Sequence, residues 1–385
     1  MRIAMFGGSF NPIHNGHLDI ARAVRSEFAP DRLIFVVAGD PPHKTLADNV
    51  PAAVRFEMTR RALENEPGME ASDIEMRRGG KSYTADTVDE LMLMYPGAEI
   101  CVIVGKDMLD TIESWHEPER MIKNAVLIGA DRPNVAADLE DSAQRLRREL
   151  GAKVLLTTVG GPDISSTMIR DAVRDAKPVY HLTPQSVWSY VYENGLYQPD
   201  EIDVLLPRLK KSLSPKRYLH TMGAMAEAIE LAGRYGYDGA KARLAALLHD
   251  CGKVDHEAQL TLAGKYGLDA DCIIPALLHE KLSAIMAKAE YGVTDRDIIN
   301  AIDCHTTGRV GMTLLDKLLF VADKTERLTR SDGLMGEARA LAYEDIDRAV
   351  LKLMDMSIEY VLQTGGELDG CTLSARDDII NKISE

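Results

Sequence analysis

Short apolar runs alternate with helical patterns in the first half of the chain. Nearly continuous apolar residues occupy Ile3–Phe6, Leu33–Val37, Ile100–Val104, Ala125–Ile128 and Val154–Leu156. Such runs are typical of strands buried on both faces of a parallel sheet. Apolar residues recur with helical spacing in His17–Phe28, Ala52–Asn65, Tyr83–Tyr95, Leu139–Leu150, Ser166–Arg174 and Pro184–Glu193. Repeated strand–helix–strand units predict a doubly wound α/β domain with a parallel sheet.

The pattern changes after Asn194-Gly195. The segment 196–215 holds Pro199, Pro207 and Pro215 and predicts a connector with at most one short helix. Helical spacing then dominates in Arg217–Tyr235, Ala240–His249, Asp271–Tyr291, Asp295–Cys304, Leu314–Leu328 and Asp345–Leu362. The second half therefore reads as an all-α bundle. We expect one domain over 1–197, a linker over 198–212 and a second domain over 213–385.

The bulk composition agrees with two domains and limits the partners. A chain of 385 residues has room for two cores. A net charge of −15 argues against nucleic acid, yet a small anionic substrate can still be held by local cations and helix N-termini. Five cysteines without C-x-x-C spacing indicate reduced thiols: Cys101, Cys251, Cys272, Cys304 and Cys371.

The chain shows neither a signal-peptide pattern nor an apolar run of about 18 residues. We therefore expect a cytoplasmic protein with no membrane contact. The oligomeric state stays open, and a homo-oligomer is compatible with the sequence.

The first apolar run leads directly into Gly7-Gly8-Ser9-Phe10-Asn11-Pro12-Ile13-His14-Asn15-Gly16-His17. Glycines after a strand let the backbone approach a phosphate, and the following helix offers free N–H groups. A plain tight turn explains the two glycines equally well. His14 and His17 lie three residues apart at a helix start, so both rings can face one anion. A metal pair and two unrelated surface histidines are the alternatives.

Four further segments carry candidate binding groups. Ile164–Arg170 places hydroxyls at a helix start with Arg170 one turn on, which suits a phosphate, although an ordinary cap with a solvated arginine is the alternative. Lys44 follows two prolines and is either a mobile cation for the ligand or a solvated loop residue. Tyr83-Thr84 offers a ring and backbone groups to a pyridine base, or simply caps a helix. Gly105 and Asp107 follow the third apolar run, where open α/β sheets bind ligands.

Taken together, these motifs resemble a known family. His14-x-Gly16-His17 resembles the H-x-G-H signature of the nucleotidyltransferase superfamily, and Gly7–His17 resembles bacterial nicotinate-nucleotide adenylyltransferases. Pro41–Lys44, Ser82–Thr87 and Ile164–Arg170 match the same family in the same order, over roughly the first 197 residues. The resemblance implies a Rossmann-like fold and adenylyl transfer from ATP to nicotinate mononucleotide, with Mg²⁺ neutralising the pyrophosphate that leaves.

The resemblance also implies residue roles. Contacts to the triphosphate and catalysis fall to His14, His17, Lys44 and Arg170. The ATP site takes in Gly8, Ser9, Phe10, Gly105, Asp107, Ser166 and Thr167. The nicotinate site takes in Tyr83, Thr84 and Trp115. Lys106 departs from the small residue usual in the family, and it either reaches a phosphate or points to solvent.

Histidines and aspartates beside apolar residues mark the second half. They are His220, His249, Asp250, His279, His305 and Asp323. A lone histidine on an apolar face is usually a core residue, but four of them with two aspartates favour a transition metal. A shared carboxylate such as Asp250 can bridge two ions about 3.5–4 Å apart.

This half resembles the HD superfamily of metal-dependent phosphohydrolases over Leu213–Leu362. It is most similar to the bacterial subgroup that splits diadenosine tetraphosphate symmetrically into two ADP. The likeness is carried by Arg217–Thr221, His249–Lys253, His279, His305–Met312 and Leu319–Asp323. It implies that the six residues above hold a pair of ions, with iron as the expected metal.

The same resemblance makes Asp250 and Lys253 catalytic and turns Lys253 and Arg309 toward substrate phosphates, with surface salt pairing as the alternative. Lys324–Arg327 keeps the subgroup's pattern only in part. Two other readings therefore stay open. The helical half is a nucleotide sensor or interaction module, or the first half uses another acceptor such as nicotinamide mononucleotide or phosphopantetheine.

Overall fold

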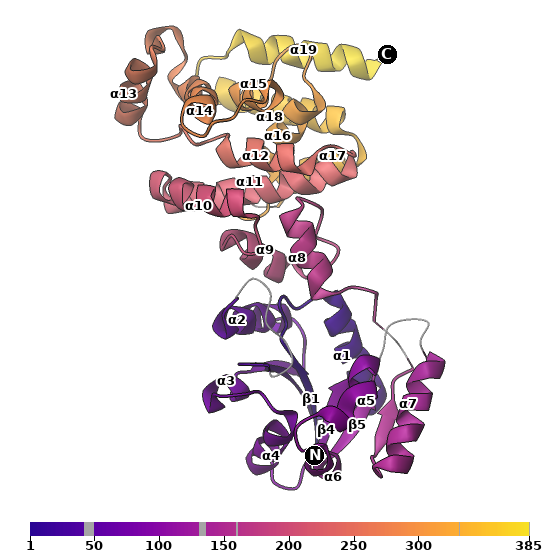
Figure 1. The fold of residues 1–385 in the computed structure, drawn as a ribbon. Helices are drawn as coiled ribbons and strands as arrows, with labels where there is room; N and C mark the ends of the chain where they lie inside the picture. Colours follow the sequence, from indigo (N-terminus) through magenta and orange to yellow (C-terminus); the bar gives the residue numbers. More distant parts are fainter. Residues whose placement is uncertain (42–49, 131–135, 159–160, 331, 385) are drawn as a thin grey trace. The chain divides into compact units, whose positions relative to one another are not determined.

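The computed structural model describes residues 1–41, 50–130, 136–158, 161–330 and 332–384. The chain divides into two compact units, which we describe one at a time (Figure 1). The first comprises residues 1–171 and 180–190, and the second comprises 172–179 and 191–385. The domain bounds expected from the sequence stay predictions.

The first unit is built on one parallel sheet of six strands in the order β3-β2-β1-β4-β5-β6. The strands are β1 (Arg2–Gly8), β2 (Arg32–Val37), β3 (Met69–Ser72), β4 (Glu99–Val104), β5 (Ala125–Gly129) and β6 (Val154–Leu156). This confirms the doubly wound α/β fold. Successive strands are added on one side of β1 as far as β3 and on its other side from β4 onward, so the strand order reverses at β1, which pairs with both β2 and β4. Open α/β sheets bind ligands at such a point, beyond the carboxyl ends of the strands.

Helices flank this sheet (Figure 1). They are α1 (Asn15–Phe28), α2 (Ala52–Leu63), α3 (Ile74–Arg78), α4 (Thr84–Met94), α5 (Lys106–Thr111), η2 (Ile112–Ser114), α6 (Pro118–Asn124) and α7 (Ala136–Glu149). The division between the two units falls within the next two helices, α8 (Ser166–Arg174) and α9 (Gln185–Glu193). Alternate strand residues such as Ile3, Val102 and Leu127 form one core with apolar residues of α4 to α7. This packing holds the carboxyl ends of β1 and β4 in place.

The second unit is helical, as predicted. Its elements are α10 (Asp200–Ser212), α11 (Pro215–Arg234), α12 (Gly239–Leu248), α13 (His256–Tyr266), η3 (Ala270–Cys272), η4 (Pro275–Leu277), α14 (Leu278–Ala289), α15 (Arg296–Asp303), α16 (Leu314–Thr325), α17 (Leu334–Glu344), α18 (Ile346–Gln363) and α19 (Gly370–Ser384). The long α11 is capped by Ser214, whose Oγ accepts from the Arg217 N–H, and it packs against α12 and α16. Of the buried histidines and aspartates of this unit, His220 lies on α11 and Asp316 on α16, and His249 and Asp250 directly follow α12.

Several segments differ from the sequence predictions; the helices α13, α17 and α19, for example, were not predicted. The strand β3 was not predicted, because it is short and only Met69 in it is buried. The helix expected over Asp271–Tyr291 begins only at Leu278, because Pro275 cannot continue a helix that starts before it. The expected connector is instead the thirteen-residue α10, where buried Leu205, Leu206 and Leu209 offset the cost of Pro207 inside the helix.

Candidate functional site

The loop after β1 is shaped around the ring of Phe10. A Cβ at Gly8 would lie 2.9 Å from this ring, so only glycine leaves room for it. The Phe10 ring meets the edges of the Phe6 and His17 rings, with centroids 5.9 and 5.1 Å away. The loop therefore holds its shape through buried aromatic contacts.

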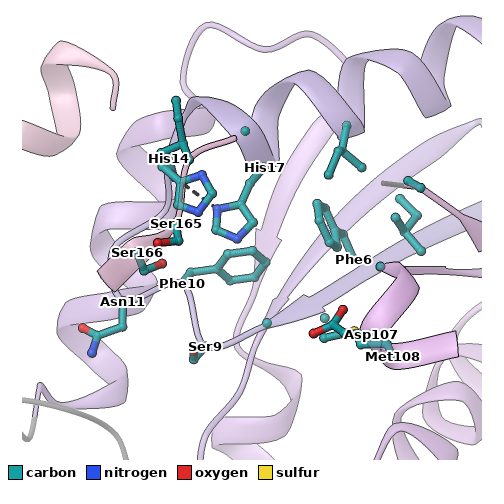
Figure 2. Close-up of a pocket in the computed structure, with 18 of the residues that line it drawn as sticks. Phe6, Ser9, Phe10, Asn11, His14, His17, Asp107, Met108, Ser165 and Ser166 are labelled. Carbon is teal, nitrogen blue, oxygen red and sulfur yellow. Dashed lines mark hydrogen bonds between the residues drawn. The ribbon is translucent and has the colours of Figure 1, made fainter. Parts of the chain in front are cut away.

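His14 and His17 lie together at the start of α1 (Figure 2). Their rings stack with centroids 3.6 Å apart, and the backbone N–H of His14 donates to Nδ1 of His17 at 3.2 Å. Because Nδ1 of His17 accepts this bond, the neutral ring carries its proton on Nε2. His17 is thus prepared to donate through Nε2.

The segment Ile164–Arg170 contacts the loop after β1, although more than 150 residues separate them in sequence. Ser166 Oγ donates to the carbonyl of Pro12 at 2.8 Å, and Arg170 donates to the carbonyl of Asn11 at 2.8 Å. A second Arg170 nitrogen donates to Thr167 Oγ1 at 3.1 Å. The start of α8 is therefore held against the loop that carries the two histidines.

A cavity of about 450 Å³ opens between these segments. The residues expected to bind ATP that line it are Gly8, Ser9, Phe10, His14, His17, Gly105, Asp107, Ser166, Thr167 and Arg170. Lys44 lies outside the described residues. Every other residue expected at the ATP site thus reaches one cavity.

A second cavity of about 430 Å³ adjoins the first and holds the three residues expected to bind nicotinate, Tyr83, Thr84 and Trp115. Both cavities are lined by Gly7, Gly8, Ser9, Asp107 and Met108, at the ends of β1 and β4. The two cavities therefore meet at the point where the sheet order reverses.

Sequence reasoning missed two residues near these cavities. Arg55 on α2 is fully buried and donates to the carbonyls of Ser9 and Ala38 at 2.6 and 2.7 Å, which ties together the loops after β1 and β2. His116 stacks on the Tyr83 ring with centroids 4.0 Å apart and also lines the second cavity. A helical arginine beside surface glutamates gives no sign of such burial. The position of His116 directly after Trp115 is the one sequence signal that it lies near the same cavity.

Lys106, the departure from the family pattern, lies on α5. Its ammonium donates to Asp110 one turn further along the helix, at 2.6 Å. Bonds from Lys106 and Ser142 lower the pKa of Asp110. Lys106 thus has a carboxylate partner on its own helix, and it is absent from the lining of both cavities.

In the second unit, the six expected metal ligands come together inside the helical bundle. His220 lies on α11, His279 on α14 and Asp323 on α16, while His249 with Asp250 and His305 follow the ends of α12 and α15. The four histidines and Asp250 are at most 3% exposed. Two groups could each hold an ion: His220, His249 and Asp323, and His249, Asp250 and His305.

The two carboxylate oxygens of Asp250 face different histidines. Oδ2 lies 3.8 Å from His220 Nε2 and 3.5 Å from His249 Nε2. Oδ1 lies 3.5 Å from His279 Nε2 and 3.6 Å from His305 Nε2. Each oxygen therefore belongs to a separate set of nitrogens.

Burial and charge act together on the titration of these groups. Burial opposes the charge of Asp250, but His249, His305 and Lys253 hold its pKa well below the usual value. Burial likewise opposes protonation of His249, yet Asp250 and Asp323 raise its pKa to about 9. For His279, burial and then His305 and Lys253 lower the pKa to about 3. The site is a set of mutually dependent charges.

The donor set fits a divalent metal. Among the described residues, His249 Nε2 and Asp250 Oδ1 are buried without a hydrogen-bond partner, which is costly unless a ligand satisfies them. The opposite nitrogens of His249 and His305 contact the carbonyls of Ala246 and Ile302 at 2.6 and 2.7 Å. These contacts leave Nε2 of both rings facing inward, as metal-binding histidines require.

Three cations border this centre. Arg217 donates to Asp250 Oδ2 at 2.6 Å, Lys253 lies 3.7 Å from Asp250 Oδ1, and Lys324 donates to Asp323 Oδ2 at 3.3 Å. Arg309 instead holds the buried Asp316 at 2.7 Å, beside the cap of α16. Of the two residues expected to face phosphates, Lys253 lies at the metal ligands and Arg309 has a carboxylate partner.

Comparisons with known proteins agree with this division. A cytidylyltransferase-like family model matches residues 5–172, and an HD domain model matches residues 217–328. A probable nicotinate-nucleotide adenylyltransferase of Desulfitobacterium hafniense is 38% identical over 200 residues, which cover 51% of this chain and 96% of the relative. A probable nicotinate-nucleotide adenylyltransferase of Geobacter metallireducens is 37% identical over 215 residues. The match covers 52% of this chain and 100% of that relative.

One solved structure is titled a predicted HD superfamily hydrolase involved in NAD metabolism, from Clostridium acetobutylicum. It is 38% identical, with a TM-score of 0.44, and the match covers 47% of this chain and 97% of that one. Within the described ranges, no helix has the length and apolar character needed to cross a membrane. Over about half of its length the chain belongs to the nicotinate-nucleotide adenylyltransferases, and a second region carries an HD domain.

Proposed function

We propose that the first unit transfers the adenylyl group of ATP to nicotinate mononucleotide, giving nicotinate adenine dinucleotide and pyrophosphate. The observation that carries this proposal is the pair of adjoining cavities, one beside His14 and His17 and the other beside Tyr83 and Trp115. Two nucleotides seated there would bring their phosphates together at the carboxyl end of β1. The names of the relatives support the same substrates.

In this reaction a phosphate oxygen of the mononucleotide attacks the α-phosphorus of ATP, and the bond to pyrophosphate breaks. Positioning and charge stabilisation are sufficient for such a transfer. We assign the Nε2–H of His17 and the guanidinium of Arg170 to the phosphates of ATP, which enters as its Mg²⁺ complex. Ser166 and Thr167 begin α8, and the first N–H groups of a helix have no acceptor within the helix.

The test is a substrate panel on the full chain. Pyrophosphate release is measured with ATP and, in turn, nicotinate mononucleotide, nicotinamide mononucleotide and phosphopantetheine. We expect the highest kcat/KM with nicotinate mononucleotide. A higher value with either other acceptor would overturn the substrate assignment but keep the adenylyl transfer.

We propose further that the HD domain is a hydrolase that splits diadenosine tetraphosphate into two ADP. His220, His249, Asp250, His279, His305 and Asp323 would hold two divalent ions, with iron as the metal. When bound, such ions lower the pKa of water and draw charge from phosphate oxygens. Lys253, at the edge of the ligand set, would contact a substrate phosphate, and Asp250 would present one oxygen to each ion.

Two measurements test this proposal on the same preparation. Metal content after anaerobic, iron-replete purification should approach two ions per chain, and Asp250→Ala should lose them. ADP release from diadenosine tetraphosphate is then followed with Fe²⁺, Mn²⁺ or Co²⁺. Bound metal without ADP release would favour a sensing module, whereas absence of metal would reject the site.

A further inference from the structure

The buried carboxylate of Glu326 contacts the ring of His220 from outside the ligand set. Glu326 follows the last residue of α16, and its side chain is completely buried. Its Oε1 lies 3.2 Å from His220 Nδ1. On the opposite side of the ring, Nε2 lies 3.0 Å from Asp323 Oδ1. Two carboxylates one helical turn apart therefore bracket a single imidazole.

Glu326 is itself held in place by backbone donors. It accepts from the N–H groups of Leu328 and Thr329 at 2.6 and 3.0 Å, and also from the hydroxyl of Thr329. These bonds fix the carboxylate without help from His220. The ring is thus oriented by Glu326, and not the reverse.

The packing of α11 makes room for this carboxylate. Gly223 lies one turn after His220, and a Cβ there would approach Glu326 Oε2 to 2.1 Å. Any side chain at position 223 would displace Glu326. A glycine inside a long helix is less stable than an alanine there, and this glycine lies where Glu326 comes closest to α11.

The other ligand rings are oriented differently. His249 and His305 use carbonyls three residues before them, and both arise from local helix geometry. The partner of His220 comes from a helix 106 residues away and carries a charge. A carboxylate that accepts from Nδ1 keeps the proton on that nitrogen and leaves the Nε2 lone pair for an ion.

We infer that Glu326 is a positioning residue of the metal centre, which holds His220 in the tautomer and orientation that bind an ion through Nε2. This inference rests on the proposed metal site. It assigns a function to a residue outside the ligand set, and it predicts that metal affinity depends on a side chain that touches no ion.

The experiment measures Mn²⁺ and Co²⁺ affinity of the full chain by calorimetry, together with the visible spectrum of bound Co²⁺. Glu326→Gln should weaken binding roughly 10–100-fold and shift the Co²⁺ spectrum. Gly223→Ala, which displaces the carboxylate without removing it, should act in the same direction. Thermal unfolding in chelator shows whether each variant stays folded.

The matched control is Glu227→Gln on α11. Glu227 is equally buried, and its carboxylate oxygens accept from Arg327 and Tyr343. We expect its metal affinity and Co²⁺ spectrum to equal those of the wild type. Equal loss in both glutamine variants, or wild-type affinity in Glu326→Gln, would overturn the inference. A wild-type chain that binds neither ion would instead reject the proposed metal site.

Discussion

The two candidate sites hold their polar groups by opposite means. In the sheet unit, Ser166, Arg170 and Arg55 donate to backbone carbonyls of the loops around the cavities. In the helical unit, Asp250 and the histidines face one another inside the bundle. The first site is therefore a shape set by the backbone, and the second is a balance of buried charges.

This difference predicts different sensitivities. Bonds to backbone carbonyls do not depend on the protonation of their acceptor, so the folded shape of the nucleotide site should change little with pH. Buried charges that stabilise one another lose that support when one is removed or neutralised. The metal centre should respond strongly to both changes.

The largest effect is expected from Asp250→Ala. It removes the carboxylate shared by both sets of nitrogens, so ADP release should fall to the level of chelator-treated wild type. Leaving His249 and Arg217 without their partner should also cost about 3–5 kcal/mol in the stability of the metal-free helical unit. Pyrophosphate release should stay within twofold of wild type. A variant that kept its metal would contradict the shared role of Asp250.

His17→Ala should impair the nucleotide site of the sheet unit and leave the helical unit unchanged. Losing one preorganised donor typically costs 10²–10³-fold in kcat, and we expect a loss of about that size in pyrophosphate release. ADP release should not change. His256→Ala, an exposed histidine on α13, serves as the control. Pyrophosphate release within twofold of wild type would remove His17 from the reaction.

Arg55→Met tests whether backbone contacts shape the nucleotide site. Two or more buried carbonyls lose a charged donor, so unfolding free energy should fall by about 3 kcal/mol. Both tryptophans, Trp115 and Trp188, belong to the first unit, so their fluorescence during urea unfolding reports on this unit. Arg55→Lys keeps the charge but not the fork of donors and should recover only part of the loss.

A smaller and more gradual effect is expected from pH on the chelator-treated chain. His249 has a folded pKa of about 9 against about 6.5 when unfolded, so its stabilisation is complete below 6.5 and is lost as the pH rises through 9. His279 has a folded pKa of about 3, so the unfolded chain takes up its proton first and stability falls as the pH drops below 6.5.

The metal-free helical unit should therefore be most stable near pH 6.5, and its melting temperature, followed by circular dichroism, should be highest there. The tryptophan-monitored transition of the sheet unit should change much less over the same range. Equal pH profiles for the two transitions would contradict the contrast between the sites.

Much of the fold was readable from local patterns. Apolar runs buried on both faces predicted the parallel sheet, and helical spacing after Gly195 predicted the bundle. The pattern failed where a segment is too short to show a period, as in β3, or where one residue interrupts it, as Pro275 does. It also underestimated α10, because burial of its leucines outweighs a proline.

The residues with unusual chemistry were visible in the sequence, since histidines and glycines at fixed spacing stand out from their surroundings. The resemblance to two families implied that they group into one nucleotide site and one metal site, and the structure brings them together in one cavity and one buried cluster. Arg55, His116 and Glu326 were not visible, because each resembles an ordinary charged or polar residue within its own segment.

By itself the sequence determined the two fold classes and the motifs that carry most of the candidate chemistry, because periodicity and residue type are local properties. Only the tertiary structure decided that Asp250 presents one oxygen to each pair of histidines, that Glu326 contacts His220, and that two cavities share the end of β1. These facts depend on distances between atoms far apart in the chain, and packing alone sets such distances.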